Sequence, residues 1–342
     1  MDQALPAKLT SVAELDELLS RPSAGLVSFM KQLDGDIMVV GAGGKVGPTL
    51  TRLVQRAITA AKVQKKVVAV DVAPLDALAA EGIETHRCDM MDLDAVGKLP
   101  KTKNIIYLIG RKFGSTGAES LTWAVNCTVA YHAARAFQGC RIAGFSTGCV
   151  YPVMHLNSGG ATEETTPEPV GEYAQSCLGR ERMWDYYADQ GKLDMVHIRL
   201  NYAVECRYGV LYDIGSKVWA GEPVDVTTGY ANVIWQGDAC NQIVQALGLA
   251  SHPASILNVT GPETFSVRLV AEQFARLMGK KAEFSGQENG YGYLNNAAKA
   301  NGLYGNPTVP LARIVDYTAQ WIMAGGANLG KPTHFETQNG KY

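Results

Sequence analysis

An α/β fold is predicted for this chain of 342 residues, with a doubly wound parallel sheet and a smaller C-terminal lobe. The first observation is a short buried strand, Asp36–Gly41, that runs straight into a glycine-rich turn. The second is the alternation that follows, in which buried strands are separated by segments of helical periodicity. The third is the loss of this regularity after Asn201, where turn-rich segments begin. Alternation at this spacing favours parallel strands joined by right-handed crossovers.

The individual elements follow from local patterns. Before the first strand, Ser11 and Glu14 have the spacing of a capping box ahead of a leucine stripe, which predicts a helix packed on the body. Further along, helical periodicity predicts helices over residues 46–62, 120–138 and 173–190. Short apolar runs predict buried strands over residues 36–41, 66–71, 104–109, 141–145 and 195–200.

Composition excludes several classes of partner. The net charge is −2 with 19% charged residues, so no basic surface is expected for nucleic acid or an anionic membrane. Seven scattered cysteines without a C-x-x-C pair argue against a disulfide framework and against a metal site, and favour a reducing, cytoplasmic location. The N-terminus does not have the pattern of a signal peptide, and no run of about 18 apolar residues predicts a membrane span.

The glycine-rich turn indicates a binding site for a dinucleotide. Glycines at 41, 44 and 47 allow a tight turn, close approach of the backbone to a pyrophosphate, and close packing of helix on strand. The helix that follows offers free N–H groups and a partial positive charge to phosphates. We therefore expect a Rossmann-type site with the cofactor held by Gly41, Gly44, Lys45, Val46 and Gly47.

Two acidic residues refine this prediction. Asp71 ends the next strand, 24 residues beyond Gly47, where a carboxylate accepts both adenosine ribose hydroxyls and repels a 2′-phosphate. NAD is therefore favoured over NADP. Asp89 and Met90, after the third strand, are expected near the adenine, although Asp89 has the alternative of capping a turn or helix. The predicted parts are an N-terminal helical extension over 1–34, an NAD-binding Rossmann domain over 35–200, and a substrate lobe over 201–342 that is partly interleaved with it.

With these pieces in place, the sequence resembles the extended short-chain dehydrogenase/reductases, the NAD-dependent epimerase/dehydratase group, over roughly residues 36–280. The matching pieces are the glycine turn, Asp71, Asp89, Tyr107–Gly110, Asn126, Phe145–Tyr151, Tyr173 and Arg199–Tyr202. The resemblance implies an NAD-dependent dehydrogenase or epimerase and a homodimer formed through the helices at 120–138 and 173–190. It also places the strand end Leu108, Ile109 and Gly110 against the nicotinamide.

The resemblance also assigns catalytic roles. Thr147, with Ser146 second, would orient the reacting oxygen, and Asn126 would support the site's backbone or a proton-relay water. Tyr173 would exchange the proton, but an ordinary phenol with a pKa of about 10 is a poor base at neutral pH. The family lowers that pKa with a lysine four residues later, and this chain has Cys177 there. The replacement cation stays open among Arg180, Lys112 and Arg111, and Cys177 is either a packing residue or a titrating thiol.

Two departures bear on the substrate. The family's diphosphate-binding arginine is replaced by Ala231, which favours a sugar or sugar acid without a nucleotide, held by Asn201 and Arg207. Arg207 has the alternative of a surface salt bridge. The Asp-Glu pair of the dehydratases is replaced by Gly148-Cys149, which favours oxidoreduction or epimerisation. A non-catalytic NAD-binding sensor and a lyase or dehydratase with tightly held NAD remain as alternatives.

Overall fold

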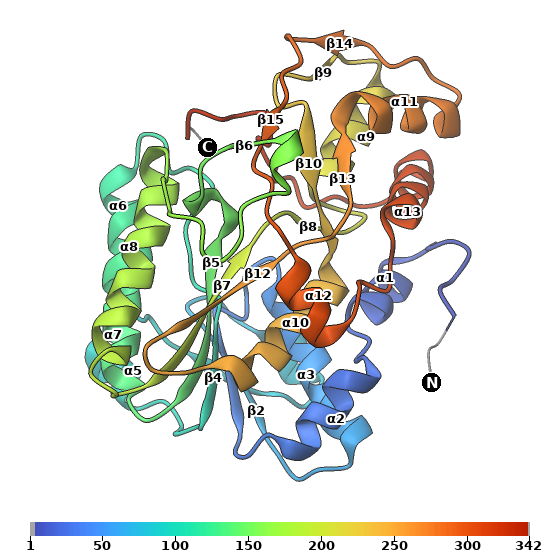
Figure 1. Ribbon diagram of the computed structural model, residues 1–342. Coiled ribbons are helices and arrows are strands. Elements are labelled where there is room, and N and C mark those ends of the chain that lie inside the picture. The colour runs from blue at the N-terminus through green and yellow to red at the C-terminus, as the bar shows by residue number, and fades with distance from the viewer. Residues whose placement is uncertain (1–3, 341–342) are drawn as a thin grey trace.

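The predicted doubly wound sheet is confirmed. The computed structural model describes residues 4–340, and its central sheet has seven parallel strands in the order β12-β7-β5-β4-β1-β2-β3 (Figure 1). The strand bounds are Ile37–Val40 (β1), Val67–Asp71 (β2), Glu84–Arg87 (β3), Asn104–Tyr107 (β4), Arg141–Thr147 (β5), Asp194–Leu200 (β7) and Ser255–Val259 (β12). The strand order reverses between β1 and β4, the place where ligands bind in sheets of this kind.

Helices cover both faces of the sheet (Figure 1). One face packs on α2 (Ala24–Gln32), α3 (Gly47–Ala61), α10 (Gln236–Gln245) and α12 (Ala298–Tyr304). The other packs on α5 (Leu93–Gly97), α7 (Val129–Ala136) and α8 (Gly171–Ala188), whereas α4 (Asp76–Ala80) is a short helix between β2 and β3. In the described part of the chain, no helix combines the length and the apolar character needed to span a membrane.

The second lobe has a core of its own. It contains α9 (Val210–Ala220), α11 (Val267–Met278), α13 (Leu311–Met323) and short strand pairs. These strands are β6 (Met154–His155), β8 (Ala203–Val204), β9 (Val224–Asp225), β10 (Tyr230–Asn232), β11 (Ile234–Trp235), β13 (Thr264–Ser266), β14 (Phe284–Ser285) and β15 (Tyr291–Gly292). The predicted boundary between the Rossmann domain and the second lobe at 200/201 remains a prediction. Strand β12 follows this boundary in the sequence but pairs with β7 in the central sheet, so the two parts are interleaved.

The N-terminal extension joins the two cores. Helix α1 (Val12–Leu19) begins where expected, with the Ser11 hydroxyl accepting the N–H of Glu14 at 3.2 Å. Its Leu15 and Leu19 are buried in the core of the second lobe. The following helix, α2, was not predicted, and it buries Met30 beneath the sheet. The extension therefore packs against both halves of the molecule.

The long helix expected over 120–138 is interrupted. It consists of α6 (Glu119–Trp123), a π-helical turn over Ala124–Thr128, and α7. Asn126 lies inside this turn and is fully buried. Such turns occur often at functional sites because they change the direction in which one side chain points. Periodicity could not reveal the interruption, since one inserted residue leaves the apolar pattern on either side intact.

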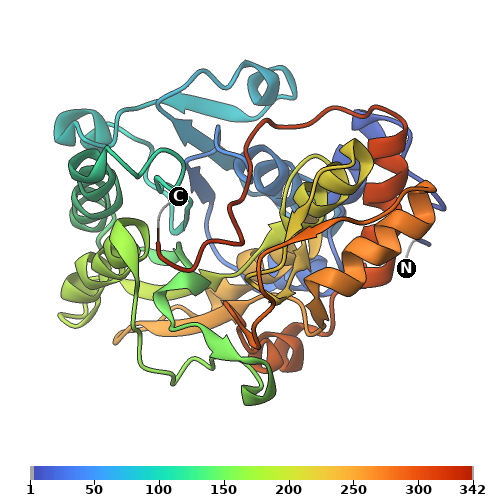
Figure 2. The same cartoon turned by 90° about the horizontal axis from the view of Figure 1, so that it is seen from above.

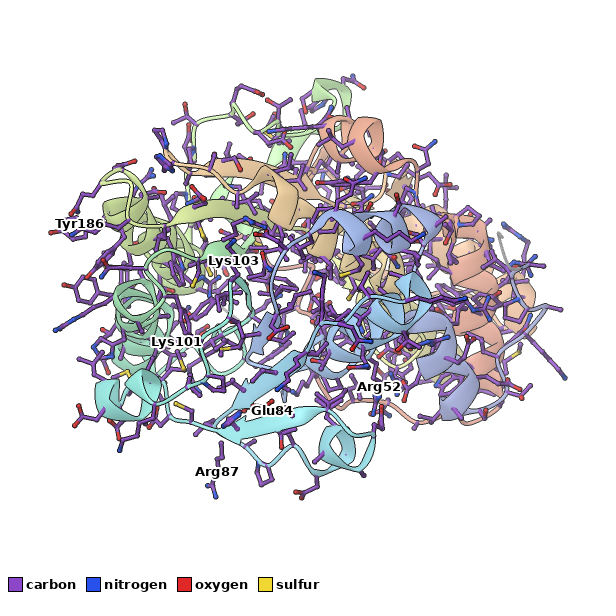
Figure 3. All side chains as sticks on the ribbon, turned by 90° about the horizontal axis from the view of Figure 1, so that it is seen from below. Arg52, Glu84, Arg87, Lys101, Lys103 and Tyr186 are labelled. Carbon is purple, nitrogen blue, oxygen red and sulfur yellow. The ribbon has the colours of Figure 1, made fainter. Side chains whose placement is uncertain are left out.

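The outer face of α8 carries an aromatic cluster. Tyr186 projects from this helix into solvent and is 58% exposed, whereas Trp184 and Tyr187 are buried (Figure 3). The rings of Tyr186 and Tyr187 meet edge to face with centroids 5.3 Å apart. The homodimer through this helix remains a prediction.

Candidate active site

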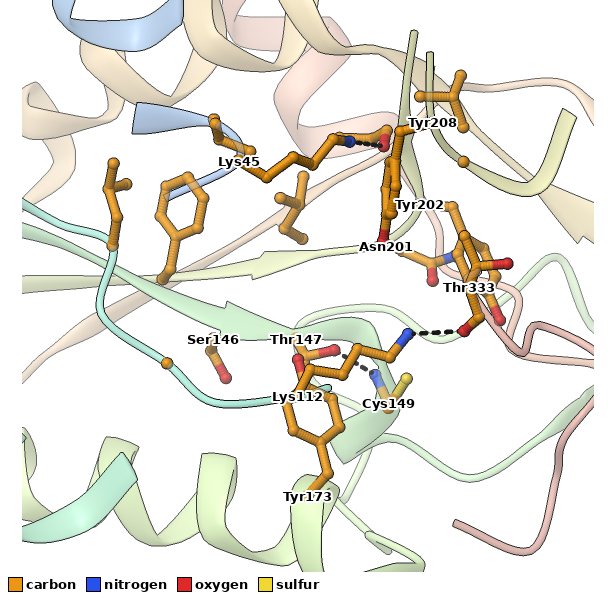
Figure 4. A pocket seen from close by; sticks show the side chains of 18 of the residues that line it. Lys45, Lys112, Ser146, Thr147, Cys149, Tyr173, Asn201, Tyr202, Tyr208 and Thr333 are labelled. Carbon is orange, nitrogen blue, oxygen red and sulfur yellow. Dashed lines mark hydrogen bonds between the residues drawn. The ribbon is translucent and has the colours of Figure 1, made fainter. Parts of the chain in front are cut away.

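A cavity of about 190 Å³ lies at the carboxyl ends of the central strands, where they meet the second lobe (Figure 4). Strand β5, the ends of β4 and β7, the glycine turn after β1 and helix α8 all contribute lining residues. The charged and polar side chains that line it include Lys45, Lys112, Thr147, Tyr173, Arg180 and Asn201. Among the described residues, no aspartate or glutamate lines this cavity.

The glycine turn has the backbone geometry expected of a phosphate cradle. Gly41 has φ of +90°, a conformation that disfavours residues with a side chain. A Cβ on Gly47 would lie 2.4 Å from the carbonyl oxygen of Ala42, so only glycine permits this close packing of α3 on the turn. No side chain caps the N-terminus of α3 at Val46. The first N–H groups of that helix are therefore available to an anion.

The two predicted adenosine contacts occupy different environments. The Asp71 carboxylate lies at the end of β2 and accepts the N–H groups of Gly43 at 2.8 Å and Ala73 at 2.9 Å. It thus holds the glycine turn in place and retains lone pairs for a ribose. Asp89 is exposed, and its carboxylate accepts the N–H of Met91 at 2.9 Å. This contact matches the alternative role of Asp89, the capping of a turn. The cofactor contacts of both residues, and of the neighbouring Met90, remain predictions.

Two lysines point into the cavity from opposite sides (Figure 4). Lys45, on the glycine turn, donates from Nζ to the carbonyl of Ala203 at 3.2 Å and lies 3.5 Å from the centroid of the Tyr208 ring. Burial of this ammonium group lowers its pKa to about 7. Lys112 donates to the carbonyl of Thr333 at 3.2 Å, and burial lowers its pKa as well.

The partners of these lysines were missed by sequence reasoning. Tyr208 belongs to the second lobe, and Thr333 to the C-terminal segment after α13. Figure 2 shows this segment running from the second lobe back toward the sheet domain, where Gly340 packs against Gly171 at the start of α8. No local pattern marks either segment as part of a site.

Thr147 and Tyr173 both line the cavity, and their catalytic roles remain predictions. Thr147 ends β5, is buried, and accepts the N–H of Cys149 at 3.2 Å. A hydrogen bond links its side chain to that of Tyr173 on α8. Burial raises the pKa of the Tyr173 phenol well above its ordinary value, and the bond to Thr147 and the charge of Arg180 act against this rise.

Ser146, the second candidate hydroxyl, is committed elsewhere. Its Oγ donates to Oε1 of Glu181 at 2.5 Å. The same carboxylate accepts two hydrogen bonds from Arg199, at 3.0 Å from Nε and 2.8 Å from Nη2. Ser146 therefore anchors the end of β5 to a buried ion pair, and Thr147 is the hydroxyl left to face a ligand.

Asn126 braces the backbone after β4. Its Oδ1 accepts the N–H of Arg111 at 2.7 Å, and its Nδ2 donates to the carbonyl of Arg111 at 3.2 Å and to Ser176 at 2.8 Å. Of the two roles expected for this asparagine, these contacts match the support of the site's backbone. Gly110 lines the cavity next to this anchored residue, and Leu108 lies two residues before it.

The position of the missing lysine is occupied by a buried thiol. Cys177 is fully buried, and burial raises its pKa to about 11, so it is neutral at neutral pH. Arg180 donates from Nη2 toward its sulfur at 3.4 Å and from Nη1 to the carbonyl of Ile109 at 2.9 Å. Arg111, another candidate cation, donates to Gly114 in its own loop at 2.9 Å.

The two predicted substrate contacts differ in outcome. Asn201 lines the cavity, and its Nδ2 donates to Asn232 at 3.0 Å and to the carbonyl of Tyr293 at 2.9 Å. Arg207 does not line the cavity, and its contacts match the salt-bridge alternative, while its contact with a substrate stays a prediction. Its guanidinium pairs with Glu205 at 3.0 Å and Asp16 at 2.9 Å, so two carboxylates already neutralise it.

Comparisons with known proteins agree with this architecture. Residues 37–204 match the model of the NAD dependent epimerase/dehydratase family. Among curated proteins, no match was found.

Several solved structures share the fold across most of the chain. A UDP-glucuronic acid 4-epimerase from Bacillus cereus, in complex with UDP-glucuronic acid and NAD, is 18% identical with a TM-score of 0.70, over 84% of this chain and 98% of that one. A UDP-glucose 4-epimerase from Thermus thermophilus, in complex with NAD, is 20% identical with a TM-score of 0.67, over 85% and 99%. MoeE5, in complex with UDP-glucose and NAD, is 19% identical with a TM-score of 0.68, over 85% and 99%. These structures are complexes with NAD, in agreement with the expected cofactor, whereas the UDP-sugars in two of them give no support to the expected lack of a nucleotide on the substrate.

Proposed function

We propose that this protein is an NAD-dependent sugar epimerase, which oxidises a sugar hydroxyl to a transient ketone and then reduces it on the opposite face. The observation that carries this proposal is the hydrogen-bonded pair of Thr147 and Tyr173, set in a cavity beside the glycine turn. NAD, when bound, would accept a hydride from the sugar carbon and return it. The family match over residues 37–204 and the epimerases of similar fold support this assignment.

The chain's own residues divide the remaining work. The N–H groups at the start of α3 and the glycine turn would hold the diphosphate, and Asp71 would hold the adenosine ribose. The Thr147 hydroxyl would orient the reacting oxygen of the sugar. Tyr173 would take the hydroxyl proton onto its phenolate oxygen and give it back when the ketone is reduced. Asn126 keeps the backbone beside Gly110 in place throughout.

Two other functions are less well supported by the site. Elimination requires a group that removes a carbon-bound proton, and no carboxylate among the described residues lines the cavity. Thr147 is followed by Gly148 and Cys149, neither of which is an acid. A non-catalytic NAD sensor would have no use for a tyrosine and a threonine hydrogen-bonded to each other at the cavity wall.

The substrate test begins with UDP-sugars. MoeE5 and the Bacillus cereus epimerase are complexes with UDP-glucose and UDP-glucuronic acid, whereas Ala231 in this chain removes one phosphate contact of the family. Ala231 is buried in β10, so no side chain extends from that position toward a phosphate. We therefore include the matching free sugars and sugar acids in the same panel.

The experiment incubates the protein with NAD and each compound, follows NADH absorbance, and identifies products by chromatography. An epimerase converts the compound into its stereoisomer without net NADH. Accumulation of NADH equal to product would instead establish a dehydrogenase, and loss of water from the sugar would establish a dehydratase. NAD binding without conversion of any compound would favour the sensor.

NAD binding should be accompanied by proton uptake at Lys45. With a pKa of about 7, this lysine is mostly neutral at about pH 8, whereas a diphosphate beside it stabilises the ammonium form. The protonated state is then favoured in the complex, so NAD affinity should fall as pH rises above about 7. Calorimetry in two buffers of different ionisation enthalpy measures the uptake directly. The Lys45→Met variant should bind NAD without it, and equal uptake by both proteins would contradict the assignment.

A further inference from the structure

Helix α8 carries a buried positive charge that the proposed chemistry has not yet used. Arg180 is 3% exposed and lies beside the cavity. Within residues 4–340 no carboxylate forms an ion pair with it, and its sequence neighbour Glu181 is already held by Arg199 and Ser146. A buried charge without a counterion is costly. A nearby group that becomes negatively charged would offset the cost of burying the Arg180 guanidinium.

The guanidinium is fixed in one place. It bridges α8 and the end of β4, with Nη1 donating to Ile109 and Nη2 toward the sulfur of Cys177, while Nε has no hydrogen-bond partner. A Cβ on Gly110 would lie 2.5 Å from Nη1, so glycine at this position makes room for the arginine. The small side chain of Cys177 also leaves room for the guanidinium on the side of α8. Small residues therefore border the guanidinium on two sides.

The phenol of Tyr173, one helical turn before Cys177, is a titratable group that lines the same cavity as Arg180. The titratable and charged groups around this phenol are Cys177 and Arg180 on α8, Cys149 after β5, and Lys112 after β4. Both thiols are uncharged when protonated, and the ammonium of Lys112 lies 6.0 Å from the centroid of the tyrosine ring. Burial lowers the pKa of Lys112, whereas the guanidinium of Arg180 stays charged because arginine is not deprotonated in proteins.

We propose that Arg180 is a positioning residue that stabilises the phenolate of Tyr173, taking over from the opposite side the electrostatic role of the absent lysine at Cys177. Arg180 lies on the turn of α8 after Cys177, with its Nη2 3.4 Å from the cysteine sulfur, and both Arg180 and Tyr173 line the cavity. Unlike a lysine, it cannot give up a proton, so it supplies charge without serving as a proton relay. The inference rests on the proposed function for its role in turnover, whereas the electrostatic contact can be measured without a substrate.

The first test measures the charge state of residue 173 directly. Difluorotyrosine is incorporated at position 173 of the full-length protein, because its more acidic phenol titrates where the protein stays folded, and fluorine NMR follows the titration. Arg180→Met should raise the pKa of this phenol by about 1–3 units, since one nearby cation has been removed. Arg180→Lys should raise it less. The matched control is Arg182→Gln, an exposed arginine of the same helix, which should leave it unchanged.

A double variant distinguishes the effect of the arginine's charge from the effect of its size and shape. The double variant Cys177→Lys/Arg180→Met returns a cation to the family's usual position and should bring the pKa of the phenol back toward the wild-type value. Arg180→Met is expected to fold, because replacing a buried charge with an apolar side chain of similar size is often neutral for stability. Thermal unfolding of each variant shows whether it is folded. If Arg180→Met is unfolded, the pKa of the phenol in Arg180→Lys, which keeps the charge, is compared with the wild-type value instead.

Kinetics gives the second arm, with UDP-glucose and UDP-glucuronic acid as the compounds tested. Arg180→Met should lower kcat about ten- to a thousandfold at neutral pH, with KM unchanged and the acidic limb of the pH profile moved to higher pH. If no compound is converted by the wild type, the proposed function fails and the NMR result alone decides this inference. The inference is overturned if Arg180→Met leaves the pKa of the phenol at position 173 unchanged. It is also overturned if the double variant has the same raised pKa as Arg180→Met.

Discussion

Replacing Tyr173 with phenylalanine should lower the rate of hydride transfer about a hundred- to ten-thousandfold while leaving NAD affinity unchanged. The variant keeps the ring at the cavity wall and removes the phenolic hydroxyl that is hydrogen-bonded to Thr147. Without it, the proton of the sugar hydroxyl has no acceptor when the carbon gives up its hydride. The measurement is a single-turnover assay with any compound that the wild type converts, next to calorimetry of NAD binding.

The matched control is Tyr186→Phe, on the exposed face of the same helix. This variant should retain the wild-type rate, since its hydroxyl is remote from the cavity lining. Retention of most of the activity by Tyr173→Phe would mean that another group carries the proton. Loss of NAD binding in that variant would mean that the phenol serves the cofactor and not the proton transfer.

Replacing Glu181 with glutamine should destabilise the fold by about 3–5 kcal/mol, the usual cost of leaving a buried charge without its partner. Glu181 and Arg199 are 2% and 3% exposed in their side chains, and the carboxylate accepts two hydrogen bonds from the guanidinium. It also holds Ser146 at the end of β5. The Glu181→Gln variant should therefore unfold at a lower urea concentration. Its affinity for a ligand that contacts Thr147 should also be weaker, because the end of β5 is less well anchored.

A surface pair of the same geometry provides the control. Arg52 donates to Glu81 with distances of 2.7–2.9 Å, but the two side chains are 23% and 43% exposed (Figure 3 labels Arg52). Glu81→Gln should cost at most about 1 kcal/mol because solvent already screens the pair. Equal destabilisation by the two substitutions would show that burial does not set the strength of the Glu181 pair. Removing both charges in Glu181→Leu/Arg199→Met should recover much of the loss.

Local patterns predicted most of the framework that holds the site. Short apolar runs identified five of the seven strands of the sheet, and glycine spacing placed the turn before α3. They did not reveal α2, a helix of nine residues in which only Leu26 and Met30 are buried. Thr147 and Tyr173 were identified from the family resemblance, and the fold explains why they are neighbours: parallel strands bring their carboxyl ends to one edge, next to the helix that follows.

Other features depend on segments that only folding brings together. Tyr208 and Thr333 reach the lysines of the cavity from the second lobe and the C-terminal segment, and nothing in their own neighbourhoods indicates this. Arg207 had the right charge for an anion contact, yet two carboxylates neutralise it. In each case the deciding quantity is a distance between parts of the chain that are far apart in sequence.

The amino-acid sequence by itself determined the parallel sheet and the glycine turn, because each follows from periodicity or from spacing within one strand–turn–helix unit. The tyrosine that carries the proposed chemistry was identified from the resemblance to the extended short-chain dehydrogenase/reductases. Arg180, Lys112 and Arg111 were equally possible from the sequence. The proposal that Arg180 serves the tyrosine rests on the space beside Gly110 and Cys177, which only the tertiary structure shows. Electrostatic effects fall with distance and depend on burial, and both are set only when helix and strand are packed.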